Sequence, residues 1–209
     1  MVKPKLVLPL LIILSCSPSD EQPNQKTTSL QTKELAQPIK RTRSKTPKNI
    51  RWAYELFASA IINKDTAQLN ELIHPDLGLY IIGANGALPE IVKTNSLNKP
   101  LGIKSKMIKM DPSILTDSLK IGELPATDCD APPLFYSKSG CFGDSLNDFR
   151  NQRVWVHSNL SKQDKIEAEK SAGLITHTVI NTRGFKAYFF YDSYRWSLLF
   201  IDLRVPCSA

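Results

Sequence analysis

Apolar residues recur with helical spacing directly after a long polar stretch of the chain. They form one stripe, in which each member follows the last by three or four positions: Ile50, Tyr54, Phe57 and Ile61. This period is typical of an amphipathic α-helix. Thr46 and Pro47 predict its start, because a threonine caps free N–H groups and a proline has none to leave unpaired. A second, short helix is expected from Asp65, with Gln68 as its capping-box partner, up to Pro75.

The last third of the chain has a β pattern. Three apolar segments, 174–181, 185–191 and 195–205, are separated by short polar turns, which favours an antiparallel three-stranded meander. Both alternating rows of the last segment are largely apolar, so we expect its two faces to be covered, by the first helix on one side and by a closing sheet on the other. Another strand is expected over 77–82, closed by Gly83.

The middle of the chain is less regular. Residues 84–126 are interrupted by prolines and give no clear element. Four elements follow. We expect a loop bounded by cysteines over 127–143, a helical turn over 144–152, a short strand over 154–157 and a polar helix over 161–170. Ser161 is the expected cap of the polar helix, and Gly173 is expected just beyond its end.

A short apolar run lies near the start of the chain, over residues 6–14, after two lysines. About 20 apolar residues are needed to cross a bilayer, so the run is too short to span but suits a signal peptide. The run ends with Ile13 and Leu14, which are followed by Ser15 and Cys16. This order of two large aliphatic residues, a small residue and a cysteine resembles the lipobox of bacterial lipoproteins. The resemblance implies that 1–15 is a signal peptide, that Cys16 carries the lipid, and that the protein is anchored in the bacterial cell envelope, facing the periplasm or the exterior.

Residues 16–46 are rich in Ser, Pro, Gln, Thr and Lys and contain no aromatic residue. Such a composition cannot bury enough apolar surface to fold, so we predict a disordered tether. The net charge of +7 lies mostly in the first 48 residues. Two lysines precede the apolar run and an excess of four basic residues follows over 17–48, which leaves +1 for residues 49–209. A nearly neutral domain is not expected to bind nucleic acid, because that binding needs a dense basic face.

The order of elements, a helix pair, a strand, an irregular middle and a meander, resembles the nuclear-transport-factor-2-like fold. The segments that carry the resemblance are 50–73, 77–82 with Gly83, and 188–202 around Trp196. The chain ends in Cys-Ser-Ala, which is similar to the tails of small exported lipoproteins of this fold. We therefore expect one α+β domain over 47–209, in which N-terminal helices pack on a curved, cone-like antiparallel sheet. The middle region departs from the usual spacing, since it is longer and richer in proline.

Three cysteines remain besides Cys16, namely Cys129, Cys141 and Cys207. An exported chain can oxidise its thiols, so we expect one disulfide and one thiol left over, with three possible pairings. Loop-closure entropy gives about 2.9 kcal/mol for a 129–141 bridge and about 4.5 kcal/mol for a 129–207 bridge. This difference and the lipoprotein-like tail both favour Cys129 with Cys207, with Cys141 as the alternative partner. No closely spaced cysteine pair is present, and we expect no metal and no cofactor.

Two side chains are candidates for acid–base chemistry. His177 lies in the first strand of the meander, and Asp202 shares an alternating row with Trp196 in the last strand. A carboxylate inside an apolar cone has a raised pKa, which suits a general base. Enzymes of the resembled fold use such Asp and His pairs, which makes Asp202 and His177 the candidate catalytic residues. The alternative is that Asp202 pairs with Arg204, Arg195 or a backbone amide.

Two functions follow from these patterns, beside a purely structural envelope role for a filled cone without a pocket. The first is a non-catalytic accessory domain on the envelope that binds a small apolar ligand or another envelope protein. The alternative is a small pocket enzyme of the isomerase or hydro-lyase type. Its acid–base pair would consist of the two candidates above.

Overall fold

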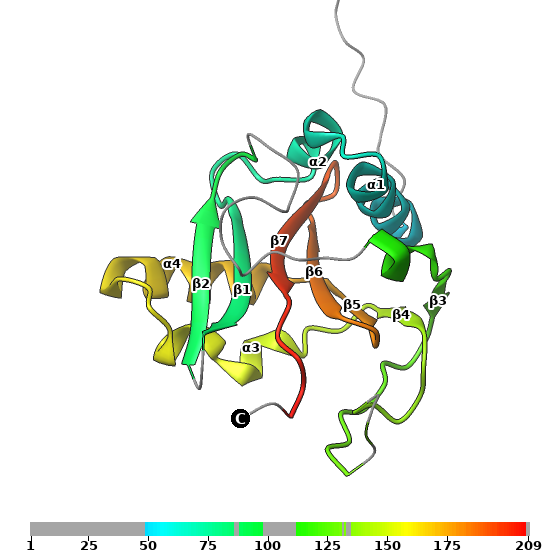
Figure 1. Cartoon of the computed structure of the whole chain (residues 1–209). Helices are drawn as coiled ribbons and strands as arrows, with labels where there is room; N and C mark the ends of the chain where they lie inside the picture. Colours follow the sequence, from blue (N-terminus) through cyan, green and yellow to red (C-terminus); the bar gives the residue numbers. More distant parts are fainter. Residues whose placement is uncertain (1–48, 86–87, 98–111, 131, 133–134, 208–209) are drawn as a thin grey trace, which may run out of the picture. The chain divides into compact units, whose positions relative to one another are not determined.

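A seven-stranded mixed sheet is the frame of this α+β protein (Figure 1). Its strands lie in the order β2-β1-β7-β6-β5-β4-β3. The bounds are β1 Leu79–Asn85, β2 Leu88–Thr94, β3 Leu119–Ile121, β4 Cys141–Asp144, β5 His177–Asn181, β6 Phe185–Tyr191 and β7 Trp196–Asp202. The sheet is not closed into a barrel, because β2 and β3 are its two edges.

The computed structural model describes residues 49–85, 88–97, 112–130, 132 and 135–207. All of these residues belong to one compact unit. The expected signal peptide over 1–15, the lipidation site Cys16 and the tether over 16–46 lie outside the described residues.

The antiparallel meander of β5, β6 and β7 is confirmed. The expectation of a wholly antiparallel sheet is wrong in two places, because β1 runs parallel to β7 and β3 runs parallel to β4. Parallel neighbours need a long connection between them, and in both cases the intervening chain provides one. The first strand of the sheet therefore lies beside the last.

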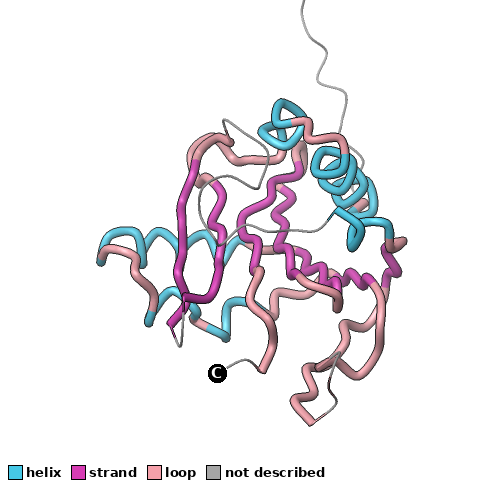
Figure 2. Tube along the Cα trace, in the orientation of Figure 1, coloured by secondary structure: helices cyan, strands magenta, loops and turns pink. Residues whose placement is uncertain are grey.

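Helices and apolar clusters cover both faces of the sheet (Figure 2). The α1-side cluster joins β7 to α1 and α2, which span Ile50–Ile62 and Thr66–Glu71. The α4-side cluster joins β7 to α3, η2 and α4, which span Phe149–Gln152, Val154–His157 and Lys162–Leu174. Every residue of β7 is buried, as its two apolar rows predict. The second cover of β7 consists of helices, however, and not of the closing sheet that was expected.

Helix caps explain where the main helices begin. The side chain of Asn49, not of the expected Thr46, caps α1 by accepting from Arg51 N at 2.9 Å. Asp65 caps α2 by accepting from Gln68 N, as predicted. Ser161 caps α4, but this helix continues through Gly173, which had been placed beyond its end. Within the described residues, no helix has the length and apolar character needed to cross a membrane.

Several elements in the middle of the chain differ from the sequence prediction. Strand β3 lies in a stretch for which no element was predicted, and β4 begins inside the predicted loop 127–143. Segment 154–157 is a 3-10 helix, η2, rather than a strand. The first strand continues past Gly83 and turns into β2, for which no element was predicted. A further 3-10 helix, η1 over Pro112–Thr116, also falls in the proline-rich stretch.

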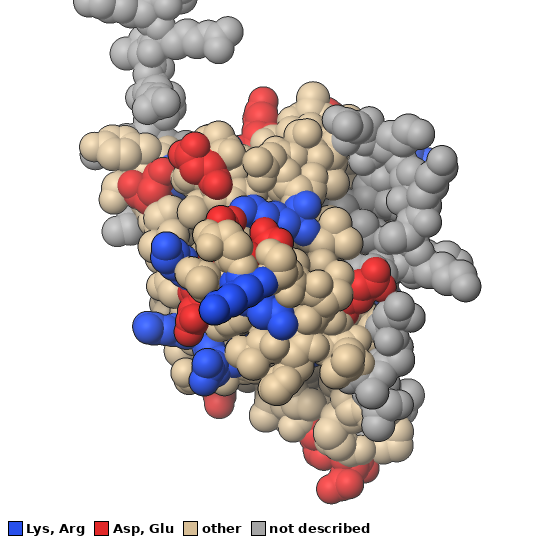
Figure 3. All heavy atoms as spheres, turned by 90° about the vertical axis from the view of Figure 1, so that its left-hand side faces the viewer, with Lys and Arg blue, Asp and Glu red and all other residues tan. Residues whose placement is uncertain are grey.

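The face that carries β2 and the start of α4 mixes charges of both signs (Figure 3). Lys93 of β2 forms an ion pair with Glu167 of α4, with Nζ and Oε2 2.6 Å apart. This pair raises the pKa of Lys93 and lowers that of Glu167. It lies at the surface, where such pairs contribute little to stability.

Candidate functional site

A β-bulge in β7 decides which way Asp202 points. The pairing of β7 with β6 skips Leu199, which has no partner of its own. Leu198, before the bulge, packs in the α1-side cluster, and Phe200, after it, packs in the α4-side cluster. Side chains alternate beyond the bulge, so Asp202 lies on the same face as Phe200. The predicted row that joined Asp202 to Trp196 is wrong for this reason.

Asp202 is held by Arg204 in an ion pair in which the carboxylate is buried and the guanidinium is partly exposed. Its Oδ1 accepts from the Nε and the backbone N of Arg204, at 2.9 and 3.1 Å, and its Oδ2 accepts from a terminal nitrogen at 2.6 Å. Only 3% of Asp202 is exposed. Burial acts to lower the pKa of Arg204, but the bonds and charge of Asp202 outweigh burial and raise it. The structure thus has the Arg204 pairing that the sequence left open as the alternative to catalysis.

His177 is not near this ion pair. It pairs with Phe189 of β6, whereas Asp202 pairs with Lys186, three positions away along the same strand. Three residues span about 10 Å of strand. The His177 ring packs at 4.9 Å from Trp196, a member of the α1-side cluster, so it also lies on the opposite face of the sheet. The structure does not bring the two predicted acid–base residues together.

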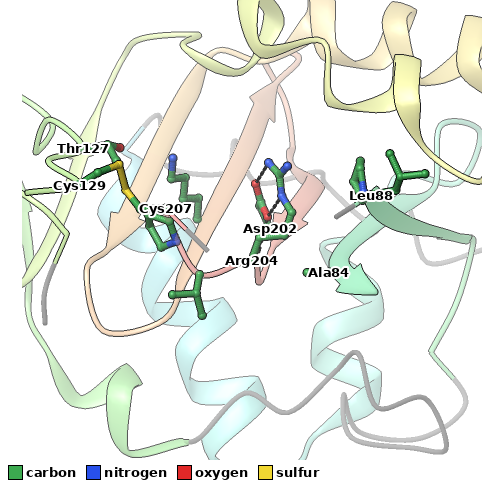
Figure 4. A pocket seen from close by; sticks show the side chains of 11 residues that line it. Ala84, Leu88, Thr127, Cys129, Asp202, Arg204 and Cys207 are labelled. Atoms are coloured by element: carbon green, nitrogen blue, oxygen red, sulfur yellow. Dashed lines mark hydrogen bonds and ion pairs between the residues drawn. A yellow bond between two sulfur atoms is a disulfide. The ribbon is translucent and has the colours of Figure 1, made fainter. Parts of the chain in front are cut away.

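A hollow of about 310 Å³ opens beside Asp202 and Arg204, where β1 and β7 end and β6 begins (Figure 4). One side is formed by the β1–β2 hairpin, where Ala84 and Leu88 lie. The other side is formed by the bonded Cys129 and Cys207 and by the neighbouring Thr127 (Figure 4). The remaining lining residues are Pro89, Lys186, Val205 and Pro206.

Charged donors dominate the polar lining of this hollow. Lys186 and Asp202 are direct partners across β6 and β7, so their side chains lie on one face next to each other. Arg204 contributes a second positive charge, and Asp202 is the one acid among the described residues of the lining. These residues therefore carry a net charge of +1. Because both Asp202 oxygens are already bonded to Arg204, the hollow offers chiefly hydrogen-bond donors.

The disulfide fixes one side of the hollow. Cys129 and Cys207 are bonded across 78 positions of sequence, with Cα atoms 5.5 Å apart. The bond ties the loop that follows β3 to the segment that follows β7. Cys141, the alternative partner, is a buried free thiol in β4. Burial raises its pKa to about 11.

Two other hollows lie among the described residues. One, of about 370 Å³, lies between α1, η1 and β3 and includes Tyr54 and Asp117. A smaller one, of about 180 Å³, lies beside Tyr80, Lys93 and Glu167. Burial raises the pKa of both tyrosines, so their hydroxyls stay protonated. Neither hollow has a net positive charge. Lys93 and Lys170 of the smaller one are balanced by Asp76 and Glu167, and the larger one has two acids against one arginine. No group of three or more His, Cys, Asp or Glu side chains in the described ranges is placed to hold a metal ion.

Lys186 is the site residue that the sequence prediction missed. It is the one charged residue in β6, an otherwise apolar strand of seven residues. A lysine in such a strand is a signal, because burying its charge is costly unless it reaches solvent or a partner. The role of Thr127 had no comparable signal, since it comes to the hollow through the disulfide-linked loop.

Comparisons with known proteins give no further assignment. No family model, no curated protein and no solved structure matches this chain.

Proposed function

We propose that this protein is a lipid-anchored envelope protein whose domain binds a small ligand in the hollow beside Asp202 and Arg204, without catalysing a reaction. The domain would be of the nuclear-transport-factor-2-like type, with its sheet bent into a cone around the N-terminal helices. Cys16 would carry the lipid, and 16–46 would act as the tether. The lipobox-like residues and the order of elements support this placement.

The observation that carries the binding function is the ion pair of Asp202 with Arg204. A carboxylate whose two oxygens both accept from a guanidinium is poorly placed to take a proton from a substrate. His177, the other candidate, is on the opposite face of the sheet. The hollow itself is near 310 Å³, at the small end of the range that ligand sites have. Binding is therefore better supported than acid–base catalysis.

Ligand binding is tested on the full-length protein extracted from the cell envelope in which it is made. Native mass spectrometry should find a small molecule bound one to one. Ala84→Trp places a large ring in the hollow and should abolish this adduct, since Ala84 is exposed and lines it. Ile121→Trp is the matched control, because Ile121 is 54% exposed on β3 and lines none of the three hollows. An adduct that survives in Ala84→Trp, or that is absent from the unchanged protein, would refute the proposed site.

The anchor is tested separately by Cys16→Ser. Lipid attachment needs the thiol as nucleophile, so this variant should incorporate no labelled palmitate and should keep its first residues. The unchanged chain should be labelled and cut before Cys16. Membrane retention and normal cleavage of the serine variant would show that the placement in the envelope is wrong.

A further inference from the structure

The hollow presents more hydrogen-bond donors than the protein uses. Arg204 has five N–H groups on its guanidinium, and Asp202 accepts from two of its nitrogens. The other guanidinium N–H groups and the ammonium of Lys186 have no hydrogen-bond partner in the part of the chain that the structure describes. A ligand that fills the hollow must therefore supply acceptors and negative charge.

Apolar side chains stand at the edge of the same hollow. Leu88 is 62% exposed and Val205 is 59% exposed, although both are large aliphatic residues. Pro89 and Pro206 add to this apolar lining. The walls can bury hydrocarbon, which the hydrophobic effect favours by about 25 cal/mol for each Å² removed from water.

We infer that the hollow binds a small organic acid, with its carboxylate on Lys186 and Arg204 and its hydrocarbon part between Leu88 and Val205. This inference rests on the proposed function and adds the chemical class of the ligand. A planar carboxylate fits the fork of a guanidinium, with Lys186 as a point charge beside it. Inorganic phosphate shares the charge but has nothing to place against the apolar walls. The oxyanion alone would leave Leu88 and Val205 exposed to water.

The class is tested by titrating the full-length protein in a nonionic detergent with hexanoate, hexanamide and inorganic phosphate. Isothermal calorimetry is used, with detergent alone as the blank. Hexanoate should bind at least about tenfold more tightly than hexanamide, because charged hydrogen bonds are stronger than neutral ones. It should also bind more tightly than phosphate. Equal affinity for hexanamide or for phosphate would overturn the inference.

Variants at Lys186 assign the effect to the site. Lys186→Met keeps the aliphatic stem and removes the charge, so hexanoate affinity should fall about tenfold. Lys186→Arg keeps the charge and should retain most of the affinity. Lys162→Met is the matched control, since Lys162 is an exposed lysine at the start of α4 that does not line the hollow. A Lys186→Met protein that binds hexanoate as the unchanged protein does would overturn the inference.

The two proposals can fail separately. If the envelope-extracted protein carries an adduct that Ala84→Trp removes, but hexanoate binds no better than hexanamide, the hollow is a ligand site and the acid class is wrong. If Ala84→Trp leaves both the adduct and hexanoate binding unchanged, the hollow is not the site and both proposals fail.

Discussion

Cys141 shows how burial sets the chemistry of single residues in this domain. Its thiol has no exposed surface, and burial is the largest of the effects that raise its pKa to about 11. The nearby Tyr54 hydroxyl acts in the opposite direction, while the charge of Asp117 adds to the rise. A thiol reacts as the thiolate, so Cys141 should be inert in the folded protein.

The shifted pKa of Cys141 predicts a loss of stability at high pH. The thiol ionises near 9 in the unfolded chain and near 11 in the folded one. The unfolded state therefore releases its proton first, and stability present below about pH 9 falls as the pH rises towards 11. Near pH 10.5 the loss should be about 2 kcal/mol. Urea unfolding of the full chain at about pH 8 and about pH 10.5 measures it.

Cys141→Ala is the control for this effect, because it removes the titrating thiol and leaves the buried tyrosines unchanged. Its stability should fall by about 2 kcal/mol less over the same pH interval. Equal pH dependence in the two proteins would mean that Cys141 ionises normally in the fold.

The sequence also indicated, but could not decide, the role of Asp202. Its neighbour Arg204 was one of three possible partners, and the row that placed it with Trp196 assumed strict alternation. Leu199 breaks that alternation, and nothing in the run Leu-Leu-Phe-Ile shows where a bulge falls. One skipped residue moves a side chain to the other face of a sheet. The face of the sheet on which Asp202 lies could therefore not be predicted from the sequence pattern.

At the scale of elements, strong periodicity gave correct predictions and short apolar runs did not. The stripe of α1 and the meander were predicted, because each buries a regular row of side chains. The run over 154–157 suits a strand or a helix equally well by pattern. Arg153 precedes it with φ 46°, and this left-handed residue separates η2 from α3. Strand β2 was not predicted because Pro89 argues against a strand, although a proline is tolerated in an edge strand.

Edge strand β2 is protected against pairing with another chain. Ile91 N donates to the Asn159 side chain at 2.7 Å, so this N–H points away from β1. Pro89 lies two residues earlier on the same side and has no N–H to offer. Together they leave little of the edge free for another strand, which natural sheets commonly avoid exposing. The β2 edge is therefore a poorer candidate for binding than the hollow beside it.

Two glycine substitutions test the element boundaries. Gly78, at the start of β1, has φ +72°, and an added Cβ would lie 2.5 Å from Asn95 Oδ1 and 2.9 Å from Thr94 O. Gly78→Ala should therefore destabilise the protein by about 1–3 kcal/mol. Gly173 lies inside α4 with open space around it, so Gly173→Ala should stabilise the protein by up to about 1 kcal/mol.

Thermal and urea unfolding of both variants measure whether each substitution lowers or raises the stability of the protein. The sign of the stability change in Gly173→Ala distinguishes a glycine inside α4, as in the structure, from a glycine beyond the helix end, as the sequence predicted. A glycine just beyond a helix end commonly has a left-handed conformation, and alanine there would destabilise. A destabilised Gly173→Ala protein would mean that α4 ends earlier than Leu174.

At the scale of the whole molecule, the sequence predicted the α+β class but not the arrangement of the sheet. Alternation along a strand shows which residues are buried, and carries no information on which strand lies beside it. The parallel neighbours β1 and β7 come from opposite ends of the domain, so their contact was invisible in the pattern. The hollow depends on that contact, since its lining comes from β1, β2, β6, β7, the loop after β3 and the segment after β7.

The disulfide gives the last prediction, which links stability to the proposed binding site. Replacing Cys129 and Cys207 by serine removes the constraint on a long loop of the unfolded chain. Loop-closure entropy predicts a loss of about 4.5 kcal/mol, which lowers the melting temperature by about 10 °C or more for a domain of this size. Cys141→Ala is the matched control, because it removes a thiol and leaves the bond intact.

The same double variant should weaken hexanoate binding, because Cys129 and Thr127 form one side of the hollow only while the loop is tied to the end of the chain. Binding is measured well below the lowered melting temperature, so that unfolding does not imitate the loss. If the variant melts lower but binds normally, the disulfide stabilises the fold without shaping the hollow. If it melts no lower than Cys141→Ala, the bond does not constrain the unfolded chain as its span of 78 positions implies.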